Sequence, residues 1–485
     1  DVFISVEGFS DAELDRFSTS SLITRTTNDI TQIQMLIVMM IRMVFYAPIM
    51  AVGGILHALA KDKSMSWIIA LAVALLFMVV FSMFSLVMPK FQVVQKLIDR
   101  LNLVVRENLE GILVVRAFDT QTFEENRFDT VNRDLTKTNL FVNRTMSGMM
   151  PAMMLIMNLI TLLVVWVGSN QVSGFQMEVG DMMAYMQYVM QIIMAFLMMS
   201  MMFIMIPRAI VSINRVVEVL QTKSSITDAR QTSCPERIRG VVEYRHVSFR
   251  YPGGDGDVLS DISFTALPGQ ITAFIGATGS GKSTLVNLLP RFYDVTGGEI
   301  LIDGVNIKDW PLHKLRQNLG FVPQKGVLFS GTIRSNLAYG DRTAGEEQIE
   351  RSARTAQAME FIESKPDLFD TLIAQGGGNV SGGQKQRLSI ARALVKNAPI
   401  NIFDDSFSAL DFKTDAKLRK ALKEETGNST QFLVAQRIST IMNADQIIVL
   451  DHGKMVGRGT HRELMADCKV YREIALSQLS EEELQ

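Results

Sequence analysis

The sequence predicts two domains of different class, a helical membrane-spanning first half followed by an α/β second half. Four apolar runs in the first half are each long enough to cross a bilayer, which takes about 20 residues. In the second half the apolar stretch ITAFIG runs directly into the glycine-rich segment GATGSGKST, residues 276–284. A further apolar stretch, NIFDD (401–405), ends in two carboxylates. These three observations set the order of the domains along the chain.

The spans are predicted at residues 34–60, 67–88, 146–168 and 182–206. The long connection 89–145 carries nine Lys and Arg residues, whereas the short third connection SNQVSGFQMEVGD carries none. Because positive charge prefers the cytoplasmic side, the long connection and both chain ends are predicted to lie in the cytoplasm. Helical apolar spacing around 109–118 predicts that helices continue beyond the membrane.

Two features of the spans have open interpretations. Arg42 lies inside the first span, where a charge is costly and often functional, although it can also snorkel from a cytoplasmic end. The last span is rich in Met, which suits a binding surface and equally suits lipid contact or helix packing. Tyr185, Gln187, Tyr188 and Gln191 share that span and could face a cavity.

The composition argues against a soluble enzyme and gives no sign of nucleic-acid binding. Hydrophobic residues make up 48% of the 485 residues, which is high for a soluble enzyme. The formal net charge of −2 gives no reason to expect nucleic acid as a partner. The two cysteines, Cys234 and Cys468, stand in different contexts and are predicted to be free thiols on the reducing side of the membrane.

The segment GATGSGKST fits the phosphate-loop pattern G-x-x-x-x-G-K-[ST] between a strand and a helix. Backbone N–H groups of such a loop close on phosphate oxygens, and the helix N-terminus adds partial positive charge. Lys282 is expected to reach the terminal phosphates, and the Ser283 hydroxyl is expected to bind Mg²⁺. The residues predicted to bind nucleotide here are Gly276, Thr278, Gly279, Ser280, Gly281, Lys282, Ser283 and Thr284.

Two further segments extend this site. Asp404 ends the strand in NIFDD and is predicted to hold Mg²⁺ through water. SGGQKQRLSIARALVKNAP begins with Ser381, which can cap a helix, while Gly382 and Gly383 allow close backbone approach. One phosphate loop already serves one triphosphate, so this second helix start needs a nucleotide on another subunit; an ordinary capped helix is the alternative.

Together these segments resemble an ABC transporter half of the exporter type, with fused transmembrane and nucleotide-binding domains. The resemblance rests on the phosphate loop, the signature VSGGQ (380–384) ending in Gln384, the strand-end Asp404 and the loop SALD (408–411). It implies that Tyr251 stacks on adenine and that Gln324 senses Mg²⁺ and contacts the membrane-domain helices. It implies an exporter-type helix bundle with long intracellular helices, followed by an α/β P-loop ABC ATPase domain with ATP and Mg²⁺ as cofactors.

The resemblance also suggests domain boundaries: a transmembrane domain at 1–215, a linker at 216–239 and a nucleotide-binding domain at 240–485. Segments 17–34 and 107–128 resemble the two intracellular loops of the family. Family halves carry two more spans than the four found here. The chain opens with DVFISVEGFS at what resembles the first intracellular loop, so the first two family spans are expected to be missing from it.

Three positions depart from the family pattern. The general base of the family is a glutamate directly after the strand-end aspartate, where this chain has Asp405. The family's switch histidine is replaced by Gln436, and the glutamate before the signature by Gln375. A carboxylate displaced by about 1 Å from its water costs on the order of 100-fold in rate, and glutamine cannot become cationic. Asp405 and Gln436 are therefore the catalytic positions predicted to be weak, while ATP binding is expected to survive.

This pattern resembles the degenerate-site subunit of bacterial heterodimeric multidrug exporters. It implies ATP-driven export of hydrophobic or amphipathic substrates, with a second ABC half-transporter as partner. Membrane lipid and hydrophobic small molecules or peptides complete the expected partners, and the plasma (inner) membrane is the expected location, with the nucleotide-binding domain in the cytoplasm. A homodimeric exporter of drugs, lipids or peptides and a regulatory ABC subunit without transport stay open as alternatives. The four spans exclude a soluble ABC ATPase of DNA repair or translation.

Overall fold

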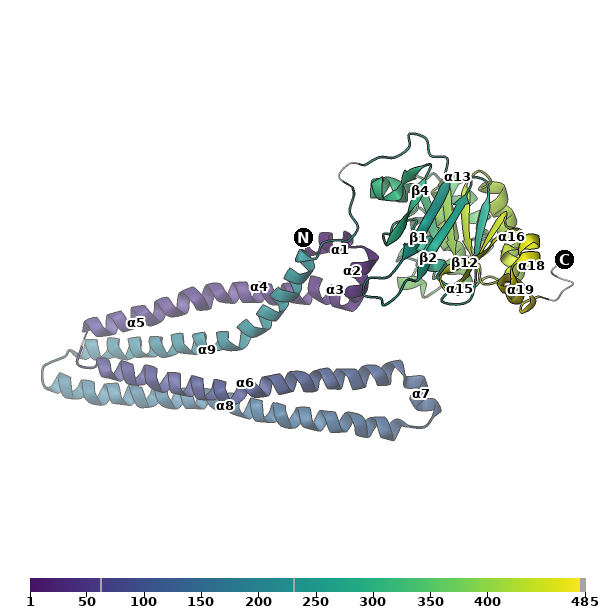
Figure 1. Cartoon of the computed structure of the whole chain (residues 1–485). Helices are drawn as coiled ribbons and strands as arrows, with labels where there is room; N and C mark the ends of the chain where they lie inside the picture. The colour runs from purple at the N-terminus through teal and green to yellow at the C-terminus, as the bar shows by residue number, and fades with distance from the viewer. Residues whose placement is uncertain (62, 230–231, 480–485) are drawn as a thin grey trace. The chain divides into compact units, whose positions relative to one another are not determined.

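The computed structural model describes residues 1–61, 63–229 and 232–479 and divides the chain into two compact units (Figure 1). Phe3–Thr19 and Gln221–Gln485 form the first, here the α/β unit, and Ser20–Leu220 form the second, here the helical unit. Residues 216–221, predicted to begin the linker, are the last turns of a long helix. The predicted domain boundaries otherwise stay a prediction.

The helical unit is built from a few very long helices. They are α3 (Thr19–Thr26), α4 (Asn28–Met40), the π-helix η1 (Ile41–Tyr46), α5 (Ala47–Lys61), α6 (Ser66–Glu110), α7 (Ile112–Ala117), α8 (Gln121–Ser173) and α9 (Val179–Gln221). With 45 and 53 residues, α6 and α8 are about 68 and 80 Å long. A bilayer core is about 30 Å thick. Both helices therefore extend far beyond it, and the predicted continuation of helices through 89–145 is confirmed.

Among the described residues, three helices are long and apolar enough to cross a membrane: α6, α8 and the part Val179–Met199 of α9. The first predicted span, 34–60, is helical throughout but is divided among α4, η1 and α5, and its apolar part Ala47–Ala60 is shorter than a full span. The side chains of Arg42 and of residues 200–208 lie outside the described residues. The two interpretations of Arg42 and of the Met-rich span therefore stay open.

Helices α6 and α8 lie side by side and share an apolar core (Figure 1). Ile68, Ala72 and Leu76 follow each other at four-residue spacing on α6 and are completely or almost completely buried. Two polar side chains of α9 bind neighbouring helices. The Tyr185 hydroxyl donates to the Met65 carbonyl at 2.7 Å, and the Gln191 amide donates to the Met50 carbonyl at 2.9 Å. These two side chains thus stabilise helix packing.

The α/β unit contains all the strands of the described chain. They are β1 (Val242–Phe249), β2 (Leu259–Ala266), β3 (Ile271–Ile275), β4 (Gly297–Ile302), β5 (Val305–Asn306), β6 (Leu319–Val322), β7 (Gly331–Thr332), β8 (Leu372–Ile373), β9 (Ile400–Asp404), β10 (Thr430–Val434), β11 (Gln446–Asp451) and β12 (Lys454–Gly459). Its helices are α1 (Val2–Glu7), α2 (Asp11–Arg16), α10 (Lys282–Asn287), η2 (Ile307–Asp309), α11 (Leu312–Gln317), α12 (Ile333–Leu337), α13 (Glu346–Thr355), α14 (Met359–Glu363), η3 (Leu368–Asp370), η4 (Gln375–Gly377), α15 (Gly382–Val395), α16 (Phe412–Glu425), α17 (Ile438–Ile441), α18 (His461–Asp467) and α19 (Lys469–Leu476).

The larger sheet has the order β12-β11-β3-β10-β9-β6, and all neighbours are parallel except β12. Strands β9 and β10 are buried at every position, as expected for central strands covered on both faces. Rings of Phe264, Phe274 and Phe432 join this sheet to the four-stranded sheet β2-β1-β4-β5. Because the strands are parallel, the residues that follow β3, β6, β9 and β10 meet at one edge.

Candidate functional site

A cavity of about 350 Å³ lies at the carboxyl edge of the larger sheet. Its lining residues are Val258, Thr278, Gly279, Gly281, Lys282, Ser283, Thr284, Gln324, Asp405, Val434 and Gln436. All of these except Val258 and Val434 are predicted from the sequence. Val434 ends β10, so the rule that parallel strand ends converge could have found it. The structure therefore brings together segments that are far apart in the sequence.

The phosphate loop between β3 and α10 is shaped around its glycines. A Cβ atom at Gly276 would lie 2.0 Å from the Leu450 carbonyl oxygen, and one at Gly281 would lie 2.7 Å from a Leu259 methyl group. Gly281 also has a φ of 95°, which side-chain-bearing residues rarely adopt. The loop can therefore fold this tightly only with glycine at these positions, and its backbone stays accessible to a phosphate.

Lys282 lies across this loop. Its ammonium group donates to the Gly276 carbonyl at 2.9 Å and to the Ala277 carbonyl at 2.8 Å. Burial lowers the pKa of Lys282, and the nearby carboxylates of Asp405 and Asp404 act in the opposite direction. The side chain is thus a cation held in place beside the cavity, which suits a polyphosphate.

Of the three residues predicted to bind Mg²⁺, Ser283 and Asp404 lie next to each other, whereas the side chain of Gln324 contacts Asp405. The Ser283 hydroxyl donates to an Asp404 carboxylate oxygen at 2.8 Å. Burial raises the pKa of Asp404, while the bond from Ser283 lowers it. Mg²⁺ in nucleotide sites is bound through one or two carboxylates, substrate phosphates and several waters. One hydroxyl and one carboxylate beside a phosphate loop fit that requirement.

Asp405 is held by two glutamine side chains. Its Oδ2 accepts a hydrogen bond from Gln436 Nε2 at 2.7 Å and a longer one from Gln324 Nε2 at 3.4 Å. The residue is buried with a φ of 46°, which is uncommon outside glycine. Burial raises the pKa of Asp405, and the surrounding hydrogen bonds lower it. Asp405 and Gln436, the two predicted catalytic positions that depart from the family pattern, are therefore in direct contact.

Tyr251, predicted to stack on adenine, follows β1 and contacts the first turn of α10. Its hydroxyl is 3.0 Å from the Thr284 hydroxyl, and its ring packs edge-on against Phe249 and Tyr293 with centroids 4.8 and 5.2 Å apart. Tyr293 was not predicted as part of the site, and no spacing rule in the sequence marks it. Only the fold brings its ring to Tyr251.

The signature segment lies elsewhere. Ser381 caps α15, because its hydroxyl accepts from the Gln384 backbone N–H at 3.3 Å and its own N–H donates to the Gln384 side chain at 2.9 Å. A Cβ atom at Gly382 would meet no atom within 4 Å. Neither these residues nor Gly383 line the cavity. Ser381 therefore caps the helix as predicted, but the signature segment is not part of the cavity beside the phosphate loop.

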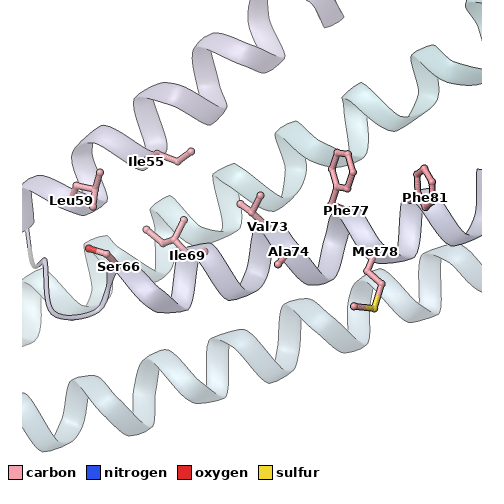
Figure 2. A pocket seen from close by; sticks show the side chains of 10 residues that line it. Ile55, Leu59, Ser66, Ile69, Val73, Ala74, Phe77, Met78 and Phe81 are labelled. Atoms are coloured by element: carbon pink, nitrogen blue, oxygen red, sulfur yellow. The ribbon is translucent and has the colours of Figure 1, made fainter.

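A second cavity lies in the helical unit between α5 and α6, with a volume of about 830 Å³ (Figure 2). It is lined by Ile55, Leu59, Ser66, Ile69, Ala70, Val73, Ala74, Phe77, Met78 and Phe81. Ser66 is the one hydroxyl-bearing residue in this set, and the aromatic rings of Phe77 and Phe81 lie along one end in Figure 2. The cavity therefore offers mainly apolar contacts.

Comparisons with known proteins agree with this arrangement. Residues 10–196 match the family model of the ABC transporter transmembrane region, and residues 259–408 match that of the ABC transporter. An uncharacterized ABC transporter ATP-binding protein of Mycobacterium tuberculosis (strain H37Rv) is 41% identical over 98% of this chain and 82% of its own length. The ATP-dependent lipid A-core flippase of Pseudomonas aeruginosa is 35% identical over 96% of this chain and 77% of its own. The solved structure of a bacterial Atm1-family ABC exporter with ATP bound has a TM-score of 0.85 at 27% identity, covering 99% of this chain and 85% of that one.

Proposed function

Because this chain belongs to the ABC transporter family, in the exporter form with fused transmembrane and ATPase domains, we propose that it is one half of a heterodimeric exporter. In this proposal its own ATP site binds ATP and hydrolyses it poorly, and its signature segment serves the partner's site. The family membership confirms the predicted fold class, the transport ATPase activity and the membrane location with a cytoplasmic ATPase domain.

The hydrogen bonding of Asp405 carries the proposal. A general base needs a carboxylate oxygen within about 2.6–3.2 Å of the proton that it takes. Oδ2 of Asp405 accepts from Gln436 and Gln324, and these bonds lower the pKa and the basicity of the carboxylate, against the raising effect of burial. The aspartate is also one methylene shorter than the glutamate of the family. Both effects favour slow activation of water at this site.

The groups that bind nucleotide are intact. Lys282 supplies a cation beside the phosphate loop, and Tyr251 supplies an aromatic ring beside α10. Ser283 and Asp404 would hold Mg²⁺, which when bound neutralises charge on the phosphate oxygens. The chain is therefore expected to keep ATP bound between slow turnovers.

The signature segment supports a role in a second site. Exporters of this family act as dimers. Ser381–Gln384 form a capped helix start that lies outside the chain's own cavity, so it is free to face a nucleotide held by another subunit. Since the signature has its serine and both glycines, we expect it to complete a working site on the partner.

The apolar cavity between α5 and α6 supports a hydrophobic or amphipathic substrate of the multidrug type. Aromatic and aliphatic side chains without fixed polar groups select weakly among such molecules. One observation favours a second candidate, a homodimeric exporter of lipids. A relative at 35% identity is a lipid A-core flippase, and its likeness extends over 96% of this chain.

Whether the bound nucleotide remains ATP or becomes ADP distinguishes the heterodimeric exporter from the homodimeric one. The full-length chain, purified alone, is incubated with labelled ATP and Mg²⁺, freed of unbound nucleotide and analysed for bound ATP and ADP. The proposal expects mostly intact ATP after many minutes, and the Lys282→Ala variant serves as the control for non-specific retention. Rapid conversion to ADP would favour the homodimer, in which Asp405 serves as the base.

A further inference from the structure

A further cavity of the α/β unit, with a volume of about 490 Å³, lies at the amino edge of the larger sheet. Asn318, Pro399 and Ser429 line it, and they immediately precede β6, β9 and β10. The nucleotide cavity lies where these same strands end, and the two cavities share no described lining residue. The amino-edge cavity is therefore separate from the ATP site.

The lining of the amino-edge cavity is hydrophilic. Of the sixteen described residues that line it, twelve carry a polar or charged side chain and none is aromatic. Cavities for small molecules are more often lined by apolar and aromatic groups. A lining of amides, hydroxyls and guanidinium groups suits a small ligand with many hydrogen-bonding groups, and it offers no aromatic ring on which a nucleobase could stack.

The buried hydroxyl of Ser352 on α13 has unused hydrogen-bonding capacity in this lining. Ser352 is 5% exposed, and its hydroxyl makes no hydrogen bond to the described part of the chain. A hydroxyl on a helix commonly bonds to the carbonyl group four residues earlier, as that of Thr355 does with Arg351 at 2.9 Å. Because buried polar groups normally have a partner, an unused one on a cavity wall indicates a ligand or water.

The buried amide of Asn401 on β9 also has unused capacity. Asparagine is depleted in strands, yet Asn401 is the second residue of this fully buried one and is 3% exposed. Its Nδ2 donates to the Ala398 carbonyl at 3.2 Å and to the Ser429 hydroxyl at 3.1 Å, which fixes the amide. Its Oδ1 accepts no hydrogen bond from the described residues, and Gly320 leaves it room, since a Cβ atom there would lie 2.2 Å away.

The charged groups of the amino-edge cavity favour an anion. The backbone N–H of Arg239 donates to Asp303 Oδ2 at 2.7 Å, whereas its exposed guanidinium group has no partner among the described residues. Arg351 Nε lies 4.0 Å from Glu425 Oε2, which makes a loose ion pair between two exposed side chains. Two guanidinium groups against one carboxylate leave the cavity with positive charge, and guanidinium groups match the geometry of phosphate oxygens.

We propose that the amino-edge cavity is a binding site for a sugar phosphate. Arg239 and Arg351 bind the phosphate group, and the buried groups of Ser352 and Asn401 bind hydroxyls of the sugar. A sugar hydroxyl both donates and accepts, so it can satisfy an unused hydroxyl and an unused amide oxygen alike. The volume lies within the range of small-molecule sites. This inference goes beyond the proposed function and does not depend on the rate of hydrolysis at the ATP site.

Two variants remove the two kinds of contact. Arg239→Gln removes a charge at an exposed position and is expected to weaken binding of glucose 6-phosphate about 10- to 100-fold. Ser352→Ala removes a hydroxyl that no described residue uses and is expected to weaken binding about 2- to 10-fold, without lowering the melting temperature. Arg462→Gln is the matched control, because Arg462 is an exposed arginine on α18 that does not line the cavity.

Equilibrium binding of radiolabelled glucose 6-phosphate to the full-length chain tests the proposal. A saturating non-hydrolysable ATP analogue with Mg²⁺ keeps the phosphate loop occupied, so the label cannot bind there. The parent and Arg462→Gln are expected to bind the label with a Kd below about 1 mM. Unlabelled glucose and inorganic phosphate, each offering half of the ligand's groups, are expected to compete at least about 10-fold more weakly.

Three outcomes would overturn the proposal. One is the absence of binding by the parent at 10-fold higher concentrations of the label. Another is equal competition by inorganic phosphate, because the cavity would then bind an anion without recognising a sugar. The third is equal affinity of the parent, Arg239→Gln and Ser352→Ala, which would place the bound label outside this cavity. ATP turnover is not measured in this experiment, so a failure of the proposed function would leave its result unchanged.

Discussion

Replacing Asp405 by asparagine tests whether this carboxylate acts as a base, because the change removes the negative charge and keeps the shape. Asp405 Oδ2 accepts from Gln436 Nε2 at 2.7 Å and from Gln324 Nε2 at 3.4 Å. An amide oxygen can accept both bonds. Burial disfavours the charged form of Asp405, so the neutral amide is expected to leave the thermal stability unchanged or slightly higher.

The size of the loss in ATP turnover distinguishes a working general base from a poor one. A working general base contributes about 10²- to 10⁴-fold to the rate. If Asp405 is already a poor base, Asp405→Asn should lower the slow turnover of this chain by no more than about 10-fold, the upper size of one altered hydrogen bond. ATP affinity should stay within the same factor, because Lys282, Ser283 and Asp404 are untouched.

The assay is release of inorganic phosphate by the full-length chain purified alone. Lys282→Ala sets the background, and binding of a fluorescent ATP analogue confirms that Asp405→Asn still holds nucleotide. A fall of 100-fold or more at unchanged affinity would show that Asp405 is an active base, contrary to the proposed slow hydrolysis at this site.

Four other changes have defined outcomes. Lys282→Ala should weaken ATP binding at least about 10-fold in a titration, since it removes charge-assisted bonds of about 1.5–3 kcal/mol. Ser381→Ala should lower turnover of the assembled complex and leave ATP binding by this chain nearly unchanged; an unaffected complex would contradict the role in the partner's site. Gly276→Ala should lower the melting temperature and abolish ATP binding, because its Cβ would lie 2.0 Å from the Leu450 carbonyl oxygen. Tyr185→Phe should cost about 1 kcal/mol of stability in detergent, by loss of one buried bond between helices, without altering ATP affinity.

The parts of the site that the sequence predicted are those encoded over short distances. Lys282 and Ser283 begin the helix that follows β3 and the glycine-rich loop, and Asp404 ends another strand, so spacing and apolar runs are enough to identify them. The approach of Asp405 to Gln436 could be expected once both were placed at ends of parallel strands. The hydrogen bonds that occupy Asp405 could not, because they depend on side-chain rotamers.

Other features of the structure could not be predicted from the residues around them. Asp15 and Tyr293 are 278 positions apart, and nothing in either segment indicates their hydrogen bond. The π-helix at Ile41–Tyr46 shares the apolar composition of the helices around it, so periodicity did not separate it from the first predicted span. Residues 216–221 contain no helix breaker, so α9 continues through them to the polar residues that follow. The continuation of helices beyond the membrane was predictable from the helical apolar spacing around residues 109–118.

We have proposed that this chain holds ATP and hydrolyses it slowly because of Asp405 and Gln436. The most direct test is ATP turnover of the full-length chain alone, beside its Asp405→Glu, Gln436→His double variant. We expect bound ATP with negligible turnover in the parent and a gain on the order of 100-fold in the double variant. Brisk turnover by the parent that substrate stimulates, with no gain in the double variant, would contradict it and identify Asp405 as a working base.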